Sequence, residues 1–218
     1  MPTVEHEIPG FPGIHIRYDD RVTPYFEVVV FESLTKIRST ATGNKLLNLI
    51  AQSKPSKIPD FPGFPPTCRV QIVPTRERLL NPKGAKWDIS LNDSKGGIGG
   101  FAKTDEPSYN QGFKQSRDSA SECQVQDLDV ARHGGGIACK VEFNTSVTNK
   151  TSHGEWCTHF TILGHELIHA LHSLYGIRKG NSTDEENWTT GILGFESEEI
   201  SENRIRADAG VPLRVRYF

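Results

Sequence analysis

His165-Glu166-Leu167-Ile168-His169 is the stretch that decides how this chain folds and what it can bind. Residues four apart share one face of a helix, so His165 and His169 can present two imidazole nitrogens to one metal ion, with Glu166 beside them as a base. The five-residue pattern alone also fits a helix that happens to carry two histidines and a glutamate. Its meaning therefore depends on the residues around it.

Those neighbouring residues predict a buried helix over residues 155–175. Apolar side chains recur at spacings of three and four, as on a helix with one buried face. They are Phe160, Leu163, Leu167, Ala170, Leu171 and Leu174. Ser152-His153-Gly154-Glu155 offers a capping box at the start of this helix, and Gly176 offers a left-handed stop at its end. A buried helix favours the metal-site interpretation of the two histidines.

The composition predicts a globular domain rather than a nucleic-acid or membrane protein. Of 218 residues, 35% are hydrophobic and 24% are charged, which suffices for one buried core. The net charge of -2 lacks the basic excess of a nucleic-acid binder. No run approaches the roughly 18 apolar residues that cross a bilayer, and the N-terminus lacks the pattern of a Sec-type signal peptide. We expect a soluble monomer with no membrane or nucleic-acid partner.

The four cysteines predict neither a zinc knuckle nor a disulfide framework. Cys68, Cys123, Cys139 and Cys157 are widely spread and form no Cys-x-x-Cys pair. Disulfides require an oxidising compartment, so buried free thiols are the expectation.

Prolines and glycines divide the N-terminal part of the chain. Their density predicts an extended arm over residues 1–24, followed by one domain over residues 25–218. Helical spacing predicts helices over residues 25–38 and 43–52, although Val28-Val29-Val30-Phe31 would also suit a buried strand.

Alternating apolar residues predict strands over residues 68–73, 87–91 and 137–143. The last one could hold a substrate backbone at a sheet edge, although an ordinary sheet strand is favoured. Residues 96–100 are rich in glycine, but they lack the Lys-Ser/Thr pair and the strand-to-helix frame of a phosphate loop. A flexible loop is expected there.

A catalytic zinc usually has three protein ligands and one open position, so two histidines leave one ligand to find. The downstream candidates are His172, Asp184, Glu185, Glu186 and Glu196. His172 lies one helical turn beyond His169, where a hydrogen-bonding or core role fits better than ligation. A short helix over residues 183–193 could return a carboxylate to the metal helix. This reasoning does not separate Glu185 from Glu186.

His165-Glu166-Leu167-Ile168-His169-Ala170-Leu171-His172-Ser173-Leu174-Tyr175-Gly176 resembles the metal helix of clostridial neurotoxin light chains. Those proteins continue to a Glu-x-x-Thr-x-Gly segment whose glutamate is the third zinc ligand. Glu186-Asn187-Trp188-Thr189-Thr190-Gly191 matches that segment. The resemblance therefore implies a Zn²⁺ site of the gluzincin type, with Glu186 as third ligand.

The whole chain is more similar to the NleD-like zinc peptidases, which bacterial type III secretion injects into host cells. Shared features are the overall size, Gly43-x-Lys45-Leu46-Leu47-x-x-Ile50, the metal helix and the Glu-x-x-Thr-x-Gly segment. The tail adds Glu202-Asn203-Arg204-Ile205-Arg206, Leu213-Arg214 and Tyr217. Residues 156–217 carry nearly all of this similarity, and residues 53–150 carry little.

This resemblance implies a fold, an activity and a place of action. The fold would be α+β and zincin-like, with a small twisted sheet packed on the metal helix and flanking helices. The protein would be a zinc-dependent endopeptidase, secreted or translocated into the host cell cytoplasm. Its substrate would be a host signalling protein, with mitogen-activated protein kinases as the family's known target class.

In the neurotoxin-like enzymes an Arg-x-x-Tyr pair reaches across the zinc and steadies the oxyanion, and Arg214-Val215-Arg216-Tyr217 fits that spacing. The resemblance thus implies catalytic roles for Arg214 and Tyr217 beside the base Glu166. Arg206 could supply the positive charge instead. Alternatively, Arg214 and Arg216 could balance the acidic residues Glu196, Glu198, Glu199 and Glu202.

Two functions of other classes stay open on sequence alone. Zinc could serve only to stabilise a binding module, although structural zinc sites are usually closed by four ligands and favour cysteine. A catalytically inactive zinc-containing module could instead bind a host protein. Turnover of a protein substrate separates both from an enzyme.

Overall fold

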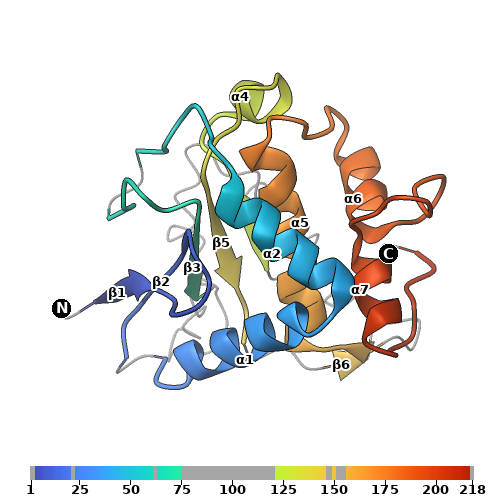
Figure 1. The fold of residues 1–218 in the computed structure, drawn as a ribbon, viewed down its shortest axis with the longest axis horizontal. Helices are drawn as coiled ribbons and strands as arrows, with labels where there is room; N and C mark the ends of the chain where they lie inside the picture. Colours follow the sequence, from blue (N-terminus) through green and yellow to red (C-terminus); the bar gives the residue numbers. More distant parts are fainter. Residues whose placement is uncertain are drawn as a thin grey trace, which may run out of the picture.

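A five-stranded sheet with helices packed against it forms the core of the computed structural model (Figure 1). The structure describes residues 3–20, 23–60, 63–74, 121–145, 149–150 and 156–216. The predicted α+β fold, with a small sheet packed on the metal helix, is confirmed. The predicted strand at 87–91 and the glycine-rich residues 96–100 lie outside the described residues.

The sheet has the strand order β1-β2-β3-β5-β4. Strands β2, β3 and β5 run parallel, and β1 and β4 pair antiparallel at the two edges. The bounds are β1 (Val4–Glu7), β2 (Ile14–Tyr18), β3 (Val70–Pro74), β4 (Glu122–Gln124) and β5 (Cys139–Phe143). A second, two-stranded sheet consists of β6 (Asn149–Lys150) and β7 (Trp156–Cys157). Parallel strands need long crossovers, which place α1 and α2 between β2 and β3.

The N-terminal residues differ from the expected extended arm over residues 1–24. Strand β2 lies between β1 and β3, with Ile14 opposite Val70, and Ile14 and Ile16 are buried in the core. Pro9, Gly10, Pro12 and Gly13, which indicated an arm, stand in the turn between β1 and β2. Residues 4–18 are therefore part of the domain.

The predicted strand at 137–143 is β5, which lies inside the sheet between β3 and β4. It is the ordinary sheet strand that was favoured, and the alternative of a substrate-binding edge for it is wrong. Among the described residues, β4 forms the edge next to the metal helix. With only three residues, β4 is too short to show the alternation from which strands are predicted.

Six helices are described, and both predicted N-terminal ones are confirmed. The bounds are α1 (Phe26–Arg38), α2 (Ala41–Gln52), α4 (Leu128–Arg132), α5 (His159–Leu174), α6 (Ser182–Thr190) and α7 (Glu202–Asp208). In α1 the helical spacing of Phe26, Val30, Leu34 and Ile37 prevails over the β-branched run, because these four side chains form its buried face.

Helix α5 carries the two-histidine motif through the centre of the molecule. Every residue from Phe160 to Leu174 is buried, because α1, α2, α4, α6, α7, β4 and β5 all pack against this helix. Its start differs from the expected one near residue 155, since the first helical residue is His159 and the backbone N–H of Thr158 donates to Thr161 Oγ1 (3.1 Å). The predicted stop is confirmed, with Gly176 at a φ of 66°.

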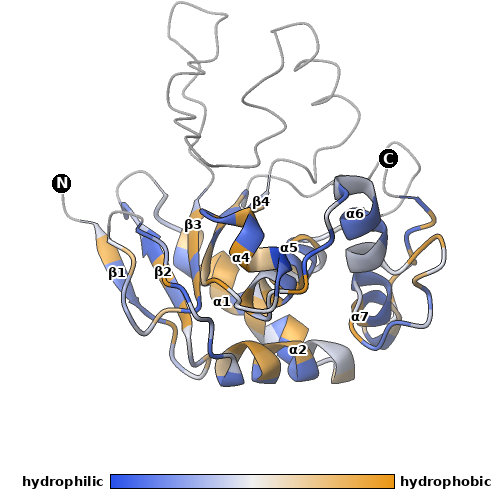
Figure 2. Cartoon of the chain, turned by 90° about the horizontal axis from the view of Figure 1, so that it is seen from above, coloured by the Kyte–Doolittle hydropathy of each residue, from blue (hydrophilic) through white to orange (hydrophobic). Residues whose placement is uncertain are grey.

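Hydropathy separates the core from the helices at the end of the chain. In Figure 2 apolar residues gather on the strands and on the helices beside them, whereas α6 is mostly hydrophilic. The buried residues of α6 are nevertheless numerous, and all are polar: Glu185, Asn187, Thr189 and Thr190.

Cys68, Cys123 and Cys139 are buried free thiols, as expected. In the described part of the chain, no helix is long and apolar enough to span a membrane.

Candidate metal centre

Two histidines of α5 and one glutamate of α6 converge on a single point. The Nε2 atoms of His165 and His169 lie 3.1 Å apart, and Glu186 Oε2 lies 3.0 Å from the first and 3.2 Å from the second. Both histidines are buried, and the Glu186 side chain is 24% exposed. The packing of α6 on α5 thus brings together the three residues that the sequence proposed as metal ligands.

The remaining nitrogen of each ring already has a carboxylate partner. His165 Nδ1 lies 2.9 Å from Glu202 Oε2, and His169 Nδ1 lies 2.9 Å from Glu185 Oε1. An ionised carboxylate only accepts hydrogen bonds, so each Nδ1 donates, and each ring in its neutral form presents a lone pair at Nε2. The two Nε2 atoms and the Glu186 oxygen therefore face one another at 3.0–3.2 Å, an arrangement that positive charge between them stabilises.

The spacing of these three atoms fits zinc. Zinc–ligand bonds of about 2.0–2.1 Å in a tetrahedron place neighbouring ligand atoms about 3.3 Å apart. Imidazole nitrogens and a carboxylate oxygen are also the donor set of catalytic zinc sites with an open fourth position. The residues present here match the group in both chemistry and geometry.

The charges around the two rings favour positive charge between them. Burial lowers the pKa of His165, but hydrogen bonds to Glu186 and Glu202 outweigh burial and raise it to about 10. Burial likewise lowers the pKa of His169, and Glu186 and Glu185 raise it to about 9. The same two histidines hold the pKa of Glu186 far below its usual range, although burial opposes this. The centre is thus built to hold positive charge.

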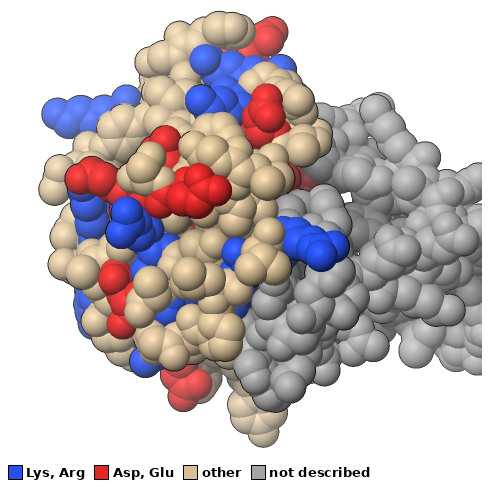
Figure 3. Space-filling model, turned by 90° about the vertical axis from the view of Figure 1, so that its right-hand side faces the viewer, with Lys and Arg blue, Asp and Glu red and all other residues tan. Residues whose placement is uncertain are grey.

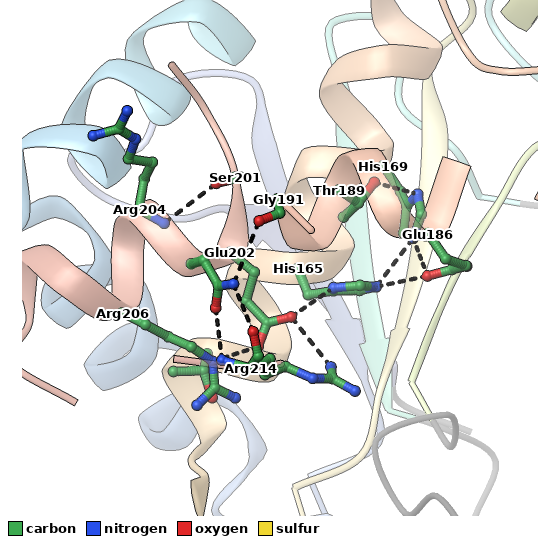
Figure 4. A network of polar contacts seen from close by, with 12 residues as sticks. His165, His169, Glu186, Thr189, Gly191, Ser201, Glu202, Arg204, Arg206 and Arg214 are labelled. Atoms are coloured by element: carbon green, nitrogen blue, oxygen red, sulfur yellow. Dashed lines mark hydrogen bonds and ion pairs between the residues drawn. The ribbon is translucent and has the colours of Figure 1, made fainter. Parts of the chain in front are cut away.

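Helix α7 supplies the carboxylate that orients His165. Glu202 also accepts a hydrogen bond from Arg206 Nε (2.5 Å) and one from Arg214 Nη1 (3.2 Å). Figure 4 shows Glu202 between His165 and these two arginines. Burial raises the pKa of Glu202, but Arg214 and Arg206 hold it well below its usual range, so the buried carboxylate stays ionised. The orientation of His165 therefore depends on an ion cluster far along the chain.

Glu185 supplies the corresponding carboxylate for His169. Its Oε1 also accepts from His172 Nδ1 (2.8 Å), and its Oε2 accepts from the backbone N–H of Lys179 (2.8 Å). His169, His172 and Glu185 form a second group with metal-binding residue types. Hydrogen bonds already satisfy that group, because both Nδ1 atoms donate to one oxygen. The structure thus separates two neighbours that spacing alone left equivalent: Glu186 faces the Nε2 atoms, and Glu185 accepts from the Nδ1 atoms of His169 and His172.

The ends of α6 explain how Glu186 is positioned. Asn181 caps the start by accepting from the backbone N–H of Thr183 (2.9 Å), and Gly191 ends the helix with a φ of 79°. A Cβ at Gly191 would lie 2.5 Å from Ser201 Oγ, so only glycine allows this approach to the start of α7. Helix α6 was predicted over residues 183–193, and the left-handed Gly191 ends it earlier.

Glu166 lies on the buried side of α5 that faces the edge strand. The backbone of Cys123, in β4, hydrogen-bonds to its carboxylate. Burial raises the pKa of Glu166 above its usual value, although His165 and His169 oppose this. A carboxylate with a raised pKa beside a metal centre is a better proton acceptor than an ordinary carboxylate.

The remaining predicted site residues have different positions. Arg214 is buried and donates to Glu202, the carboxylate that orients His165. Tyr217 lies outside the described residues. Asp184 and Glu196 are exposed, and Glu196 accepts from the backbone N–H of Gly194 (3.0 Å) instead of approaching the histidines.

Sequence reasoning missed the roles of three charged residues near the site. Glu202 and Arg206 form a buried i, i+4 pair, and that spacing just after the Ser201 cap was a signal for a helix with an internal ion pair. Arg178 has a side chain that is only 10% exposed, and it donates to Ser173 Oγ (3.4 Å) and lies 4.0 Å from Glu185. No local pattern indicates that Arg178 is buried.

The surface beside these helices carries charges of both signs. Figure 3 shows acidic and basic side chains interspersed on the face that lies on the right of Figure 1, where α6 and α7 are found. The described residues of this face therefore form no large field of one sign.

Comparison with known proteins gives one family and one solved structure of interest. Residues 16–192 match the family model Peptidase_M91, which is described as "Effector protein". No curated protein sequence matches the chain. Among solved structures, the catalytic domain of Clostridium botulinum neurotoxin serotype F is similar, with a TM-score of 0.49 and 17% sequence identity. The match covers 88% of this chain and 48% of that domain, so the chain spans about half of its length.

Proposed function

Because the chain belongs to the Peptidase_M91 family of effector proteins, we propose that it is a zinc-dependent endopeptidase that acts on a protein of a host cell. The observation that carries the proposal is the convergence of two Nε2 atoms and the Glu186 oxygen at 3.0–3.2 Å. A binding module with structural zinc is disfavoured, because such sites are usually closed by four protein ligands.

His165, His169 and Glu186 would hold the zinc ion. Zinc in such a site supplies Lewis acidity, which polarises a carbonyl group and lowers the pKa of water from about 15.7 towards about 7. Glu202 and Glu185 keep the Nδ1 protons in place, so that both Nε2 atoms stay available as ligands.

Glu166 is the proposed general base. It would take the proton of the attacking water and pass it to the departing amine, so one carboxylate serves both proton transfers. Its buried position and raised pKa support this role, because a more basic carboxylate binds the transferred proton more tightly.

Strand β4 is the proposed site for the substrate backbone. It lies at the sheet edge and contacts α5, and Cys123 in β4 hydrogen-bonds to Glu166. An extended peptide could add to this edge by main-chain hydrogen bonds, which would place a scissile bond beside the base.

Arg214 and Tyr217 are proposed to stabilise the oxyanion as donors, as the resemblance to the neurotoxin-like enzymes implies. Removing one such donor typically costs on the order of 10²- to 10³-fold in rate. The contact of Arg214 with Glu202 adds a positioning role, because it keeps ionised the carboxylate that orients His165.

The effector family supports delivery into a host cell. The similarity to the NleD-like peptidases makes a mitogen-activated protein kinase the first substrate to test. The experiment treats host-cell lysate and purified kinases with wild type and with Glu166→Gln, and maps new peptide termini by mass spectrometry. Termini that appear only with wild type support the proposal, and identical termini with both proteins overturn it.

A further inference from the structure

A stack of three side chains lies behind the metal centre, on the side away from the ligand atoms. The ring of His172 stacks on Trp188 with centroids 3.6 Å apart and planes 7° apart. The ammonium group of Lys179 covers Trp188 at 4.4 Å from its centroid. We call Lys179, Trp188 and His172 the aromatic stack.

The aromatic stack is joined to the metal ligand His169 through one carboxylate. His172 Nδ1 and His169 Nδ1 both donate to Glu185 Oε1, at 2.8 and 2.9 Å. The backbone N–H of Lys179 donates to the other oxygen of Glu185 (2.8 Å). The contacts form a closed ring, which runs from Lys179 through Glu185, His172 and Trp188 back to Lys179.

This closed ring of contacts fixes the orientations of the Glu185 carboxylate and the His172 imidazole, which hydrogen bonds alone would leave free. A carboxylate that accepts two imidazole N–H groups on one oxygen can swing about its last torsion, since sp³–sp² torsions are broad. A nearly parallel ring at 3.6 Å holds the plane of His172, and that plane sets where Nδ1 points. Glu185 is then held from both of its oxygens, so its Oε1 keeps its place as the charged acceptor for His169 Nδ1, beside the Thr189 hydroxyl at 3.1 Å.

We infer that Trp188 and His172 are positioning residues for zinc, acting through Glu185 on the metal ligand His169. The inference rests on the proposed function, because it concerns the same metal centre. Outer hydrogen-bond partners of metal-ligating histidines typically change metal affinity by about 10–100-fold when they are mutated. The aromatic stack extends that support by one residue, to a tryptophan whose ring contacts His172 and Lys179.

The experiment measures zinc affinity by competition with a chromophoric chelator, together with the melting temperature of the zinc-free protein. His172→Leu is expected to weaken zinc binding by on the order of tenfold. Trp188→Leu is expected to weaken it by about two- to tenfold, and Trp188→Phe, which keeps a stacking ring, by less than about twofold. Phe195→Leu is the matched control, because Phe195 is also partly buried beneath Lys179 (5.8 Å) but lies outside the ring of contacts.

The double variant Trp188→Leu/His172→Leu separates positioning from general stability. If Trp188 acts through His172, the double variant binds zinc as weakly as His172→Leu alone. Losses of zinc affinity that multiply would overturn the inference, as would equal zinc affinities for Trp188→Leu and Phe195→Leu.

Two further outcomes have separate meanings. If Trp188→Leu does not fold, His172→Phe keeps a stacked ring without the nitrogen, and unchanged zinc affinity in that variant also overturns the inference. A wild-type protein that retains no zinc would overturn the proposed metal centre itself, and is recognised before any variant is compared.

Discussion

Replacing Glu202 by glutamine tests whether the buried ion cluster of α7 holds the fold and the metal centre together. Glu202 accepts from His165 Nδ1 (2.9 Å), Arg206 Nε (2.5 Å) and Arg214 Nη1 (3.2 Å). Glutamine has the same shape, but only one of its two terminal atoms is an accepting oxygen. The other is an NH₂ group, which cannot accept from His165 or from the arginines. The replacement also leaves two buried arginines without their shared counter-charge.

The expected loss of stability follows from that geometry. Breaking a buried ion pair by removing one partner costs about 3–5 kcal/mol of unfolding free energy. In a domain of this size each kcal/mol shifts the melting temperature by about 2–4 °C, so we expect Glu202→Gln to melt about 6–20 °C lower. Zinc affinity should also fall by about 10–100-fold, because His165 loses its partner.

The pH dependence of this loss has a defined sign. Although burial opposes them, Arg214 and Arg206 hold the pKa of Glu202 below its ordinary value of 4.5. A lowered pKa in the folded state stabilises the protein above pH 4.5, and this contribution is lost as pH falls through the folded value. The difference between Glu202→Gln and wild type should therefore be full at pH 7 and shrink in strong acid.

The assay is thermal unfolding of zinc-free protein, with Glu199→Gln as the control. Glu199 pairs with Lys45 on the surface, with 79% of its side chain exposed, so its replacement should leave the melting temperature almost unchanged. If Glu202→Gln melts within about 2 °C of wild type at pH 7, the buried cluster does not support the fold in the way argued.

Three further predictions concern the base, a strained residue and a buried glutamate. Glu166→Gln should keep one zinc per chain while cleavage falls by about 10²- to 10⁴-fold, and normal turnover beside unchanged zinc content would refute Glu166 as base. Leu193 has a φ of 52° and a side chain that is 70% exposed, so Leu193→Gly should raise the unfolding free energy by about 0.5–1 kcal/mol in denaturant titrations, and a loss would argue against strain there. Burial, with Glu166 and Glu142 nearby, raises the pKa of Glu122 from 4.5 to about 8, which destabilises the folded state as pH rises through that range. Glu122→Gln should therefore raise the melting temperature by at least about 2 °C near pH 9 and leave it almost unchanged near pH 4, whereas equal shifts at both pH values would contradict this reasoning.

The parts of the fold that could be predicted from sequence are those with a local period. Helix α5 shows apolar residues at every third or fourth position, and the same spacing put His165 and His169 on one face. The resemblance to the neurotoxin light chains selected Glu186, and the structure brings its Oε2 to both Nε2 atoms. Local spacing was thus enough for the two histidines, whereas the choice of the distant Glu186 needed the resemblance.

What could not be predicted depends on contacts between distant segments. Strand β2 becomes a core strand only by pairing with β3, some fifty residues later, and the turns around it looked like an arm. Glu202 and Arg214 are charged residues, which are almost never fully buried unless paired, so their burial requires knowing their partners. For the same reason the contact of Arg214 with Glu202, the carboxylate that orients His165, could not be predicted.

X-ray absorption at the zinc edge, on protein reconstituted with one equivalent of zinc, tests the metal centre most directly. Wild type should show only nitrogen and oxygen ligands at about 2.0–2.2 Å, with the scattering of two imidazole rings, and His169→Ala should lose one ring. Sulfur at about 2.3 Å, an unchanged signal in His169→Ala, or zinc that is lost on gel filtration of wild type would contradict the proposed metal centre.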